Sequence, residues 1–345
     1  MKKYELNSLN KIELQEYLEN LGEKKFRAYQ LFEHIHKHKV ESLDDITVFS
    51  KQLREKIKEN GFLNQIKLVD TFKSQIDETQ KFLFELHDGQ IIETVFMSYD
   101  NRNTICVSCQ VGCKMGCSFC ASTKAWFKRD LTVSEITSQV YMVEKILDQN
   151  INNIVFMGIG EPLDNYDNMV KTILILNDPS GKNLSQRSMT LSTSGLADRI
   201  IDLADLNLSI NLAVSFHYPF DKQRSEFMPV NKRYDIKTLL KACDYYFEKT
   251  GRRVSFEYVL VDGLNDTDAH VDKLVELFRG KNIHINLIPL NEISEFKYSA
   301  SKKSNIKAFQ DRLNKRGINT TLRNKKGADI EGACGQLRVN YIGEK

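Results

Sequence analysis

Three cysteines within eight residues constrain this chain more than any other feature of its sequence. They stand in the stretch Cys113-Lys114-Met115-Gly116-Cys117-Ser118-Phe119-Cys120, a C-x3-C-x2-C pattern. This spacing suits three corners of a [4Fe–4S] cube. Because electron-transfer clusters of this kind use four cysteines, the missing fourth leaves one iron open to another ligand. The pattern therefore predicts an iron–sulfur site that also binds a second molecule.

A structural zinc site is the alternative. Cys106 and Cys109 form a C-x2-C pair close to the C-x2-C pair of Cys117 and Cys120. Only seven residues separate the two pairs, whereas a zinc ribbon has roughly 15–20 residues between them. A zinc site would also leave Cys113 without a role, so the number and spacing of the ligands favour the open cluster.

The length of 345 residues allows about two domains. No apolar run approaches the ~20 residues of a membrane span, and the N-terminal residues lack the apolar core of a signal peptide. We therefore expect a cytoplasmic protein without a membrane partner. Five of the seven cysteines lie between Cys106 and Cys120. In a reducing compartment, such clustering indicates metal or redox chemistry rather than a disulfide framework.

The net charge of +3 says little about partners, but basic residues cluster locally. The clusters are Lys24-Lys25-Arg27, Lys128-Arg129, Lys302-Lys303 with Lys307, and Arg323-Lys325-Lys326. Each cluster alone is typical of a solvated face. Together they leave a nucleic-acid partner open, because phosphate contacts need clustered Lys and Arg.

Residues 1–62 have the periodicity of a small helical unit, which could dock RNA or only stabilise the fold. Asn10 followed by Glu13 predicts a capping box at the start of its first helix. The period of the apolar residues then changes from 3.6 to 2. Residues 63–100 therefore predict a β-hairpin extension, with Asp88-Gly89 as its turn.

From residue 101 onward, predicted strands and helices alternate. The strands are expected near Thr104–Ser108, Ile154–Met157, Met189–Ser192, Ile210–Ser215, Val254–Leu260, His284–Ile288 and Asn319–Leu322. Apolar strands joined by helices predict a parallel sheet. About six such units fall short of a complete barrel of eight, so residues 101–345 predict an α/β fold, an incomplete (β/α)6 TIM-like barrel on which the hairpin packs. Its active site would lie at the C-terminal ends of the strands.

Polar or small residues follow several of these strands. Gly160 and Glu161 stand in Gly158-Ile159-Gly160-Glu161-Pro162, where glycines let the backbone approach a ligand and the carboxylate suits an ammonium group. Ser192, the segment Ser215-Phe216-His217, and Asn291 stand at or just past other strand ends. These residues are candidates for ligand binding, although each alone is also typical of a helix cap or a loop.

Two other residues are candidates for chemistry. Glu93 on the predicted hairpin suits a general base, but an exposed strand position explains it more simply. Cys334 is flanked by small residues, which give access to a nucleophile; a buried inert thiol is the alternative. Cys243, in a predicted helix, is expected to be core packing.

Taken together, these motifs resemble those of the RlmN/Cfr family of radical S-adenosylmethionine RNA methyltransferases. The resemblance is carried by the cysteine pattern, Met157-Gly158-Ile159-Gly160-Glu161-Pro162-Leu163, Leu191-Ser192-Thr193-Ser194-Gly195 and Ala333-Cys334-Gly335-Gln336-Leu337. With Pro162 after Glu161, the motif resembles that of the RlmN branch. This branch methylates C2 of the adenine at position 2503 of 23S ribosomal RNA and, in some members, adenine 37 of tRNAs. The alternatives are the Cfr branch, which methylates C8, and a non-catalytic, zinc-stabilised RNA-binding protein.

The resemblance implies the cofactors and the residues that bind them. Cys113, Cys117 and Cys120 would hold one [4Fe–4S] cluster. Its open iron would bind S-adenosylmethionine, of which each turnover uses two molecules. The residues that match contacts of this cofactor are Gly160, Glu161, Ser192, Ser215, Phe216, His217 and Asn291. The implied partners are 23S rRNA, tRNA for some members, and an electron donor such as flavodoxin or ferredoxin; we expect a monomer.

The resemblance also implies the reacting residues. Cys334 matches the cysteine that is itself methylated, and Cys106 matches the cysteine that resolves the covalent adduct by forming a transient disulfide with Cys334. Glu93 matches the proton acceptor. The chain departs from the family at Cys109, where relatives usually have Ser or Thr, and this thiol could compete in disulfide exchange.

Overall fold

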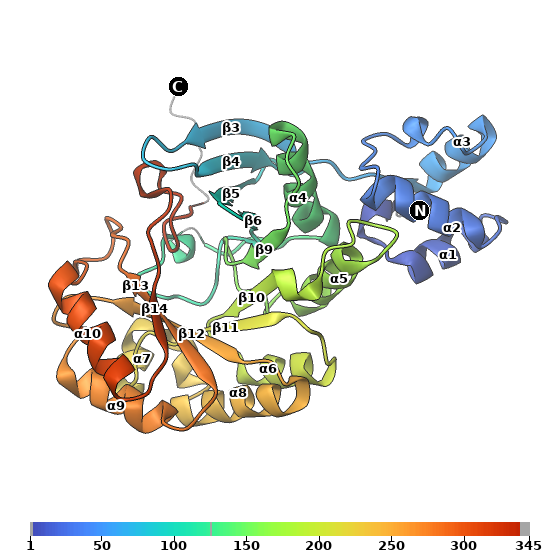
Figure 1. Ribbon diagram of the computed structural model, residues 1–345. Coiled ribbons are helices and arrows are strands. Elements are labelled where there is room, and N and C mark those ends of the chain that lie inside the picture. The colour runs from blue at the N-terminus through green and yellow to red at the C-terminus, as the bar shows by residue number, and fades with distance from the viewer. Residues whose placement is uncertain (1–2, 125, 339–345) are drawn as a thin grey trace.

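One curved sheet of ten strands organises the protein (Figure 1). The computed structural model describes residues 3–124 and 126–338. The predicted first domain began at residue 1 and the predicted last domain ended at residue 345, so residues 1–2 and 339–345 of these domains lie outside the described residues. In sheet order the strands are β14 (Thr320–Leu322), β13 (Ile283–Pro289), β12 (Val254–Leu260), β11 (Asn211–Ser215), β10 (Met189–Thr193), β9 (Asn153–Phe156), β6 (Arg102–Cys106), β5 (Ile91–Tyr99), β4 (Gln80–Glu85) and β3 (Lys67–Lys73).

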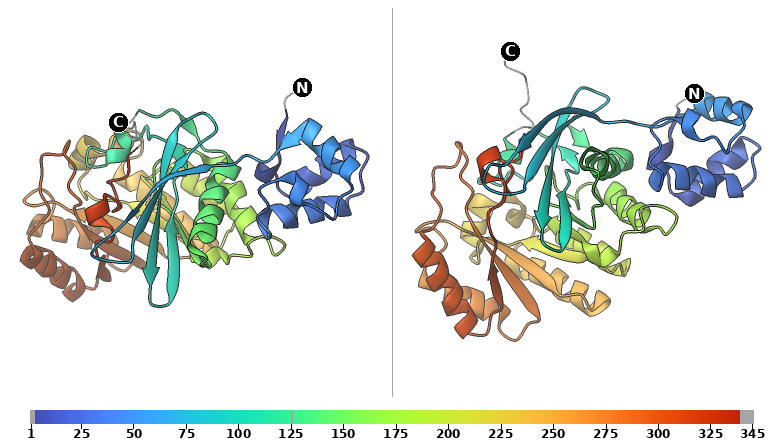
Figure 2. Two further views of the ribbon diagram at one scale, coloured as in Figure 1. Left: turned by 90° about the horizontal axis from the view of Figure 1, so that it is seen from above. Right: turned by 45° about the horizontal axis from the view of Figure 1, so that its top comes forward.

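In this sheet β6 and the strands from β9 to β14 run parallel and follow one another in chain order. The crossovers carry the helices α4 (Val133–Leu147), α5 (Tyr166–Asn177), α6 (Ala197–Asp205), α7 (Asp221–Phe227), α8 (Ile236–Thr250), α9 (Asp268–Phe278) and α10 (Lys303–Lys315). These helices cover the outer side of the sheet (Figures 1 and 2). Strands covered on both faces are apolar throughout. The strands β3 and β14 form the two ends of the sheet, so the predicted incomplete barrel is confirmed.

The strands β3, β4 and β5 are antiparallel and extend the same sheet, because β5 pairs with β6. The hairpin that was expected to pack on the barrel is therefore continuous with it. Gly89 has a φ of +78° in the predicted turn between β4 and β5, a conformation that glycine adopts without steric cost. The backbone N–H of Leu86 closes this turn by donating to the Gln90 carbonyl at 2.8 Å.

After β14 the chain turns back over the antiparallel strands; we call residues 323–338 the C-terminal segment. Figure 1 shows it beside the turn that joins β3 to β4. The Asp329 carboxylate accepts hydrogen bonds from the Ser74 hydroxyl and the Gln75 N–H, both at 2.8 Å. The Gly327 N–H donates to Asp77 at 3.1 Å. These contacts set the position of Cys334, which lies in this segment.

A helical unit stands apart at the N-terminal end (Figures 1 and 2). It comprises α1 (Lys11–Asn20), α2 (Phe26–His36), α3 (Lys51–Asn60) and the two-stranded sheet of β1 (Tyr4–Glu5) and β2 (Gly61–Phe62). The side chains and backbones of Asn10 and Glu13 cap one another, which confirms the predicted capping box. None of the helices in the described residues has the length and apolar character that a membrane crossing requires.

His36 lies where the helical unit meets α4. Its side chain is fully buried, its Nδ1 lies 3.2 Å from the Tyr141 hydroxyl, and its Nε2 has no hydrogen-bond partner among the described residues. Burial lowers the pKa of His36 from 6.5 to about 3, against the attraction of Asp178. The folded protein therefore keeps this ring neutral at a pH where the unfolded chain protonates it.

Acidification from pH 7.5 to 5.5 should destabilise the wild-type protein more than the His36→Gln variant. Below pH 6.5 the unfolded state binds a proton at His36 and the folded state does not. The free energy of unfolding therefore decreases as the pH is lowered. Over the whole interval the loss is about 1.4 kcal/mol, because the unfolded chain goes from mostly unprotonated to mostly protonated at His36 across it. Urea denaturation at both pH values measures the difference. Equal losses in the two proteins would contradict the prediction.

Candidate active site

A cavity opens at the carboxyl ends of the parallel strands and, counted together with the solvent at its mouth, holds about 1060 Å³ of empty space. The residues singled out from the sequence that line it are Cys113, Cys117, Cys120, Gly160, Glu161, Ser192, Ser215, His217, Asn291 and Cys334. They come together because parallel strands end at one edge of a sheet. We call this space the cluster cavity.

The three cysteines of the pattern lie in the loop between β6 and α4. Cys113 and Cys117 are buried, and Cys120 is half-buried. Burial raises the pKa of Cys113 to about 12, and Cys120 nearby raises it further. Buried thiols of this kind lose their protons when iron takes the place of the proton. The three side chains therefore fit a group that brings its own positive charge.

Across residues 3–124 and 126–338, no three His, Cys, Asp or Glu side chains are grouped so as to hold a single metal ion. A [4Fe–4S] cube does not need such convergence, because it bonds its three thiolates at three separate iron atoms. The shared cavity of Cys113, Cys117 and Cys120 is therefore the geometry that matters for this cofactor.

The loop after β9 forms one wall of the cluster cavity. Gly160 has a φ of +111°, and a Cβ there would lie 2.6–2.8 Å from Gln110 and from the Cys109 sulfur. Only glycine fits this position. The buried Glu161 carboxylate accepts hydrogen bonds from the N–H of Ser194 at 2.6 Å and of Leu163 at 3.0 Å. Burial raises the pKa of Glu161, and the Ser194 N–H opposes that shift.

Two buried polar atoms of residues that line the same cavity have no hydrogen-bond partner in the described structure. They are the Ser194 hydroxyl and the Asn291 Oδ1. Buried polar groups in proteins are nearly always hydrogen-bonded, so unpaired ones beside a cavity fit a polar ligand. With Glu161 near an incoming ammonium group, the donors and acceptors suit the amino-acid part of S-adenosylmethionine.

His217 is neutral in this site. Its Nδ1 accepts a hydrogen bond from the Val259 N–H at 3.0 Å, which leaves the ring proton on Nε2. Burial lowers the pKa of His217 to about 3. The neighbouring Phe216, also expected at the cofactor, has its side chain away from the cavity, where it packs against Phe256 and Phe278. Phe216 therefore does not line the cavity, and its backbone N–H and carbonyl bond to the Glu257 carbonyl and the Arg224 guanidinium instead.

Arg224 supports these strand ends, and the sequence analysis missed it because nothing local distinguishes it. Its guanidinium is fully buried and donates to the carbonyls of Ser194, Ser215 and Phe216 at 2.7, 3.0 and 3.1 Å. These carbonyls follow β10 and β11, so one side chain holds both strand ends in register. Burial lowers the pKa of Arg224 to about 10, and the group stays charged at neutral pH.

A second cavity of about 690 Å³ lies beside the first, and Cys334 lines both. Cys106 lines only the second, which we call the resolving cavity. Cys334 is an exposed residue, although protein atoms lie close enough around its thiol to desolvate it. The Asn291 amide donates to the Cys334 carbonyl at 3.0 Å and holds the backbone there. The two cysteines implicated in chemistry thus share one space.

Arg323 brings positive charge to both thiols, and it also lines both cavities. Burial raises the pKa of Cys106 to about 12 and that of Cys334 to about 11, and the Arg323 guanidinium opposes both shifts. The buried Glu257 carboxylate pairs with Arg323 at 3.3 Å. The sequence analysis included Arg323 only in a basic cluster. Its place directly after β14 is the signal that could have identified it.

Glu93 is buried, so the alternative that it stands at an exposed strand position is wrong. It lies on the same face of β5 as Val95, which pairs with Cys106 on β6. Its carboxylate lies 3.2 Å from the Lys81 ammonium and accepts the Arg338 N–H at 2.9 Å. Burial raises the pKa of Glu93, and Lys81 opposes the shift. Glu93 therefore lies beside the resolving cavity rather than on its wall.

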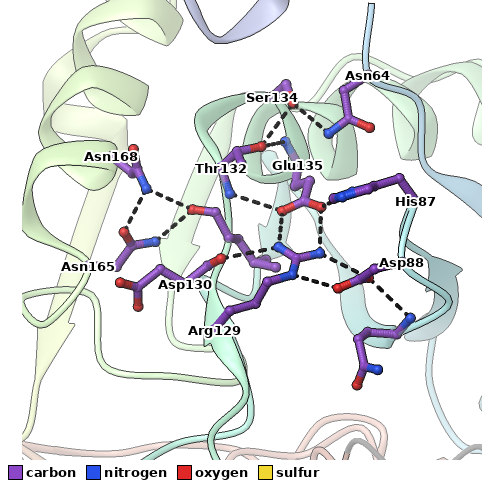
Figure 3. A network of polar contacts seen from close by, with 12 residues as sticks. Asn64, His87, Asp88, Arg129, Asp130, Thr132, Ser134, Glu135, Asn165 and Asn168 are labelled. Atoms are coloured by element: carbon purple, nitrogen blue, oxygen red, sulfur yellow. Dashed lines mark hydrogen bonds and ion pairs between the residues drawn. The ribbon is translucent and has the colours of Figure 1, made fainter. Parts of the chain in front are cut away.

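A charge network around the buried Glu135, with Arg129 half-buried and Asp88 exposed, holds the loop of the three cysteines at its return to the barrel (Figure 3). Arg129 lies in β8 (Arg129–Asp130), which pairs with β7 (Gln110–Val111). Its guanidinium binds Glu135 of α4 through two contacts, at 2.7 and 2.9 Å, and Asp88 of the β4–β5 turn at 2.7 and 3.0 Å. Asn165 donates to the carbonyls of Cys109 and Leu131 at 2.8 and 2.9 Å. Both ends of the loop are therefore anchored.

Fold and site together define a radical S-adenosylmethionine enzyme. The model of the Radical SAM superfamily matches residues 107–277. The model of the Ribosomal RNA large subunit methyltransferase N-terminal domain matches residues 4–63. A solved structure of a radical SAM methyltransferase from Sphaerobacter thermophilus superimposes with a TM-score of 0.92 at 41% identity, covering 98% of this chain and 100% of that one.

Two relatives are similar over almost their whole length. The probable dual-specificity RNA methyltransferase RlmN of Finegoldia magna is 47% identical over 98% of this chain and 97% of its own. The protein of the same name from Staphylococcus aureus (strain JH9) is 46% identical over 98% and 93%. The chain belongs to the RlmN family of radical S-adenosylmethionine methyltransferases. The predicted family and cofactors are confirmed, and neither alternative, C8 methylation or a zinc-stabilised binding protein, is supported.

Replacing Arg129 by Met should lower the free energy of unfolding by about 3–5 kcal/mol, because Glu135 would keep a buried charge without its partner. The double variant with Glu135→Gln should recover part of the loss, since no charge is then stranded. Arg199→Met, which removes an exposed pair with Asp202, should cost less than about 1 kcal/mol. Urea denaturation measures all three; a loss no larger than that of Arg199→Met would contradict the prediction.

Alanine at Cys113, Cys117 or Cys120 should each abolish iron binding, because each thiol supplies one corner of the cluster. Alanine at Cys243, which is buried beneath α8, should leave the iron content unchanged. Iron, sulfide and zinc per chain are measured after anaerobic reconstitution. Stoichiometric zinc without iron in the wild-type protein would contradict the assignment.

Proposed function

We propose that the protein methylates C2 of the adenine at position 2503 of 23S ribosomal RNA, and adenine 37 of tRNA, through a methyl group carried on Cys334. The observation that carries this proposal is the position of Cys334 on the wall of both cavities. A residue that carries a methyl group has to receive it from the cofactor in the cluster cavity and transfer it in the resolving cavity, which Cys106 lines. The RNA substrate is supported by the family and by the two relatives named as dual-specificity RNA methyltransferases.

When bound, the reduced [4Fe–4S] cluster and S-adenosylmethionine supply a methyl cation equivalent and a hydrogen-abstracting radical. Cys113, Cys117 and Cys120 would hold the cluster, and Glu161 would receive the amino group of the cofactor. The neutral His217 would present its Nε2–H to the cavity. These residues would fix and orient the cofactor at the carboxyl ends of the strands.

Cys334 acts first as a nucleophile. Its thiolate takes a methyl group, with S-adenosylhomocysteine leaving, and Arg323 favours that thiolate against the effect of burial. Loss of one hydrogen atom from the S-methyl group then leaves a methylene radical on sulfur, and this radical adds to C2 of adenine. This route is needed because C2 is electron-poor and does not attack a sulfonium methyl group directly.

Glu93 and Cys106 complete the reaction. Glu93 would accept the C2 proton: burial raises the pKa of its carboxyl, and the nearby Lys81 ammonium opposes that rise. Once the radical adduct has lost that proton and given one electron back to the oxidised cluster, the Cys106 thiolate would attack the Cys334 sulfur and form a Cys106–Cys334 disulfide. The bond from sulfur to the methylene carbon breaks, and that carbon keeps the bonding pair and takes up a proton to become the methyl group. Reduction of this disulfide restores the enzyme.

The remaining partners belong to the same proposal. A flavodoxin or ferredoxin would reduce the cluster, since the reaction needs an electron that no residue of this chain supplies. One chain contains every residue assigned above, which supports action as a monomer. The RNA substrates and the reduced state of the cysteines support a cytoplasmic location.

Cys106→Ala should trap a covalent protein–RNA adduct, because the Cys334 sulfur can no longer be attacked. The adduct appears as a gel-shifted band that survives denaturation. Cys109 should not replace Cys106: its sulfur contacts the Ile159 carbonyl at 3.6 Å, away from the resolving cavity. The Cys106→Ala and Cys106→Ala/Cys109→Ala variants should therefore give equal adduct, whereas Cys334→Ala should give neither adduct nor product. Mass spectrometry of wild-type product locates the methyl group, and 8-methyladenosine would overturn the proposed function.

A further inference from the structure

Tyr99 lines the resolving cavity, and two cations approach its ring. It ends β5, and Asp100-Asn101 connect it to Arg102, its pairing partner at the start of β6. The Arg102 guanidinium lies 4.9 Å from the centre of the Tyr99 ring, and the Lys326 ammonium lies 5.3 Å from it. Lys326 belongs to the C-terminal segment. A hairpin tip and a segment distant in the sequence thus meet around one aromatic ring.

The positive charges of Arg102 and Lys326 are not neutralised by carboxylates of the described residues. Neither Arg102 nor Lys326 forms an ion pair in the described part of the chain, and Asp77 feels Lys326 only at longer range. By contrast, many other basic side chains, such as Lys11, Lys39 and Lys81, are paired with carboxylates. Unpaired cations beside an aromatic ring suit a polyanion that carries bases.

The position relative to the thiols favours RNA over the protein that reduces the cluster. Tyr99 and Lys326 line the resolving cavity together with Cys106 and Cys334. The cysteines assigned to the cluster line the other cavity. A reductant has to approach the cluster, whereas the substrate has to approach Cys334 from the side of Cys106.

A target adenine that reaches Cys334 has to leave its stack, which deprives its neighbours of stacking partners. An aromatic ring at the mouth of the cavity can replace one of them, and cations on both sides can contact the flanking phosphates. Tyr99, Arg102 and Lys326 supply this combination; we call them the hairpin-tip surface.

Resting on the RNA substrate of the proposed function, we propose that the hairpin-tip surface is where RNA docks: a base adjacent to the target stacks on Tyr99, and Arg102 and Lys326 bind the backbone phosphates. This surface lies outside the N-terminal helical unit, which the sequence offered as the RNA-docking appendage. It makes the β5–β6 hairpin a substrate-binding element as well as a part of the sheet.

The test is equilibrium binding of a fluorescent 23S rRNA stem-loop to the cluster-reconstituted full chain, followed by anisotropy. Tyr99→Ala should bind about tenfold more weakly, and Tyr99→Phe should bind like wild type because it keeps the ring. Arg102→Ala and Lys326→Ala should each lower the slope of log affinity against log salt by about 1. The matched control is Tyr245 with Lys249, a similar ring–cation contact of 5.3 Å on α8. Alanine at either control residue should change nothing.

Unchanged RNA affinity in Tyr99→Ala overturns the inference. So does a variant that loses methylation while its affinity stays at the wild-type value, because Tyr99 would then only hold the C-terminal segment. Iron content and methylation of Cys334 in the absence of RNA show that each variant is intact, since neither requires the RNA. If instead the wild-type protein binds the stem-loop and yields no methylated adenine, the proposed function fails and the docking surface is judged by affinity alone.

Discussion

The attachment of the C-terminal segment across the open edge of the barrel is the constraint on which the rest of the structure depends. Cys334 can serve two cavities only if this segment is held from both sides. Asp329 anchors it to the β3–β4 turn, and farther along the Ser122 hydroxyl donates to the Leu337 carbonyl at 2.9 Å. The Gly335 carbonyl accepts the Ala121 N–H at 2.8 Å, directly after the last cysteine of the cluster loop. The loop that carries the three cysteines and the C-terminal segment that carries Cys334 are thus fixed to each other.

This attachment explains why the sheet has two halves. The parallel strands carry their ends to the cluster cavity, as β/α folds do. The antiparallel strands place Glu93, Cys106 and the anchor for Asp329 on the other side of Cys334. Cofactor chemistry and substrate chemistry therefore occupy neighbouring spaces that meet at one sulfur atom. Burial keeps every reactive thiol protonated at rest, and Arg323, held by Glu257, acts against it where ionisation is needed.

Much of this could be predicted from the sequence, because the signals were local. The parallel strands β6 and β9–β14 lie where apolar runs predicted strands, and the capping box at Asn10 marked the start of α1, which the structure confirms. The cysteine spacing indicated the cluster, and the family resemblance supplied the reacting thiols. Phe216 shows the limit: a residue at a strand end points to one face or the other, and sequence did not reveal that its ring packs outward.

By itself the sequence determined the order of the β/α units, the cluster-binding pattern and the family, since each depends on residues close together in the chain. Only the tertiary structure decided which distant groups meet: Arg224 with three strand-end carbonyls, Arg323 with both thiols, and Lys326 with the ring of Tyr99. The physical reason is that burial and charge act through space. The pKa of a thiol and the direction of a cation depend on neighbours that the path of the whole chain brings together.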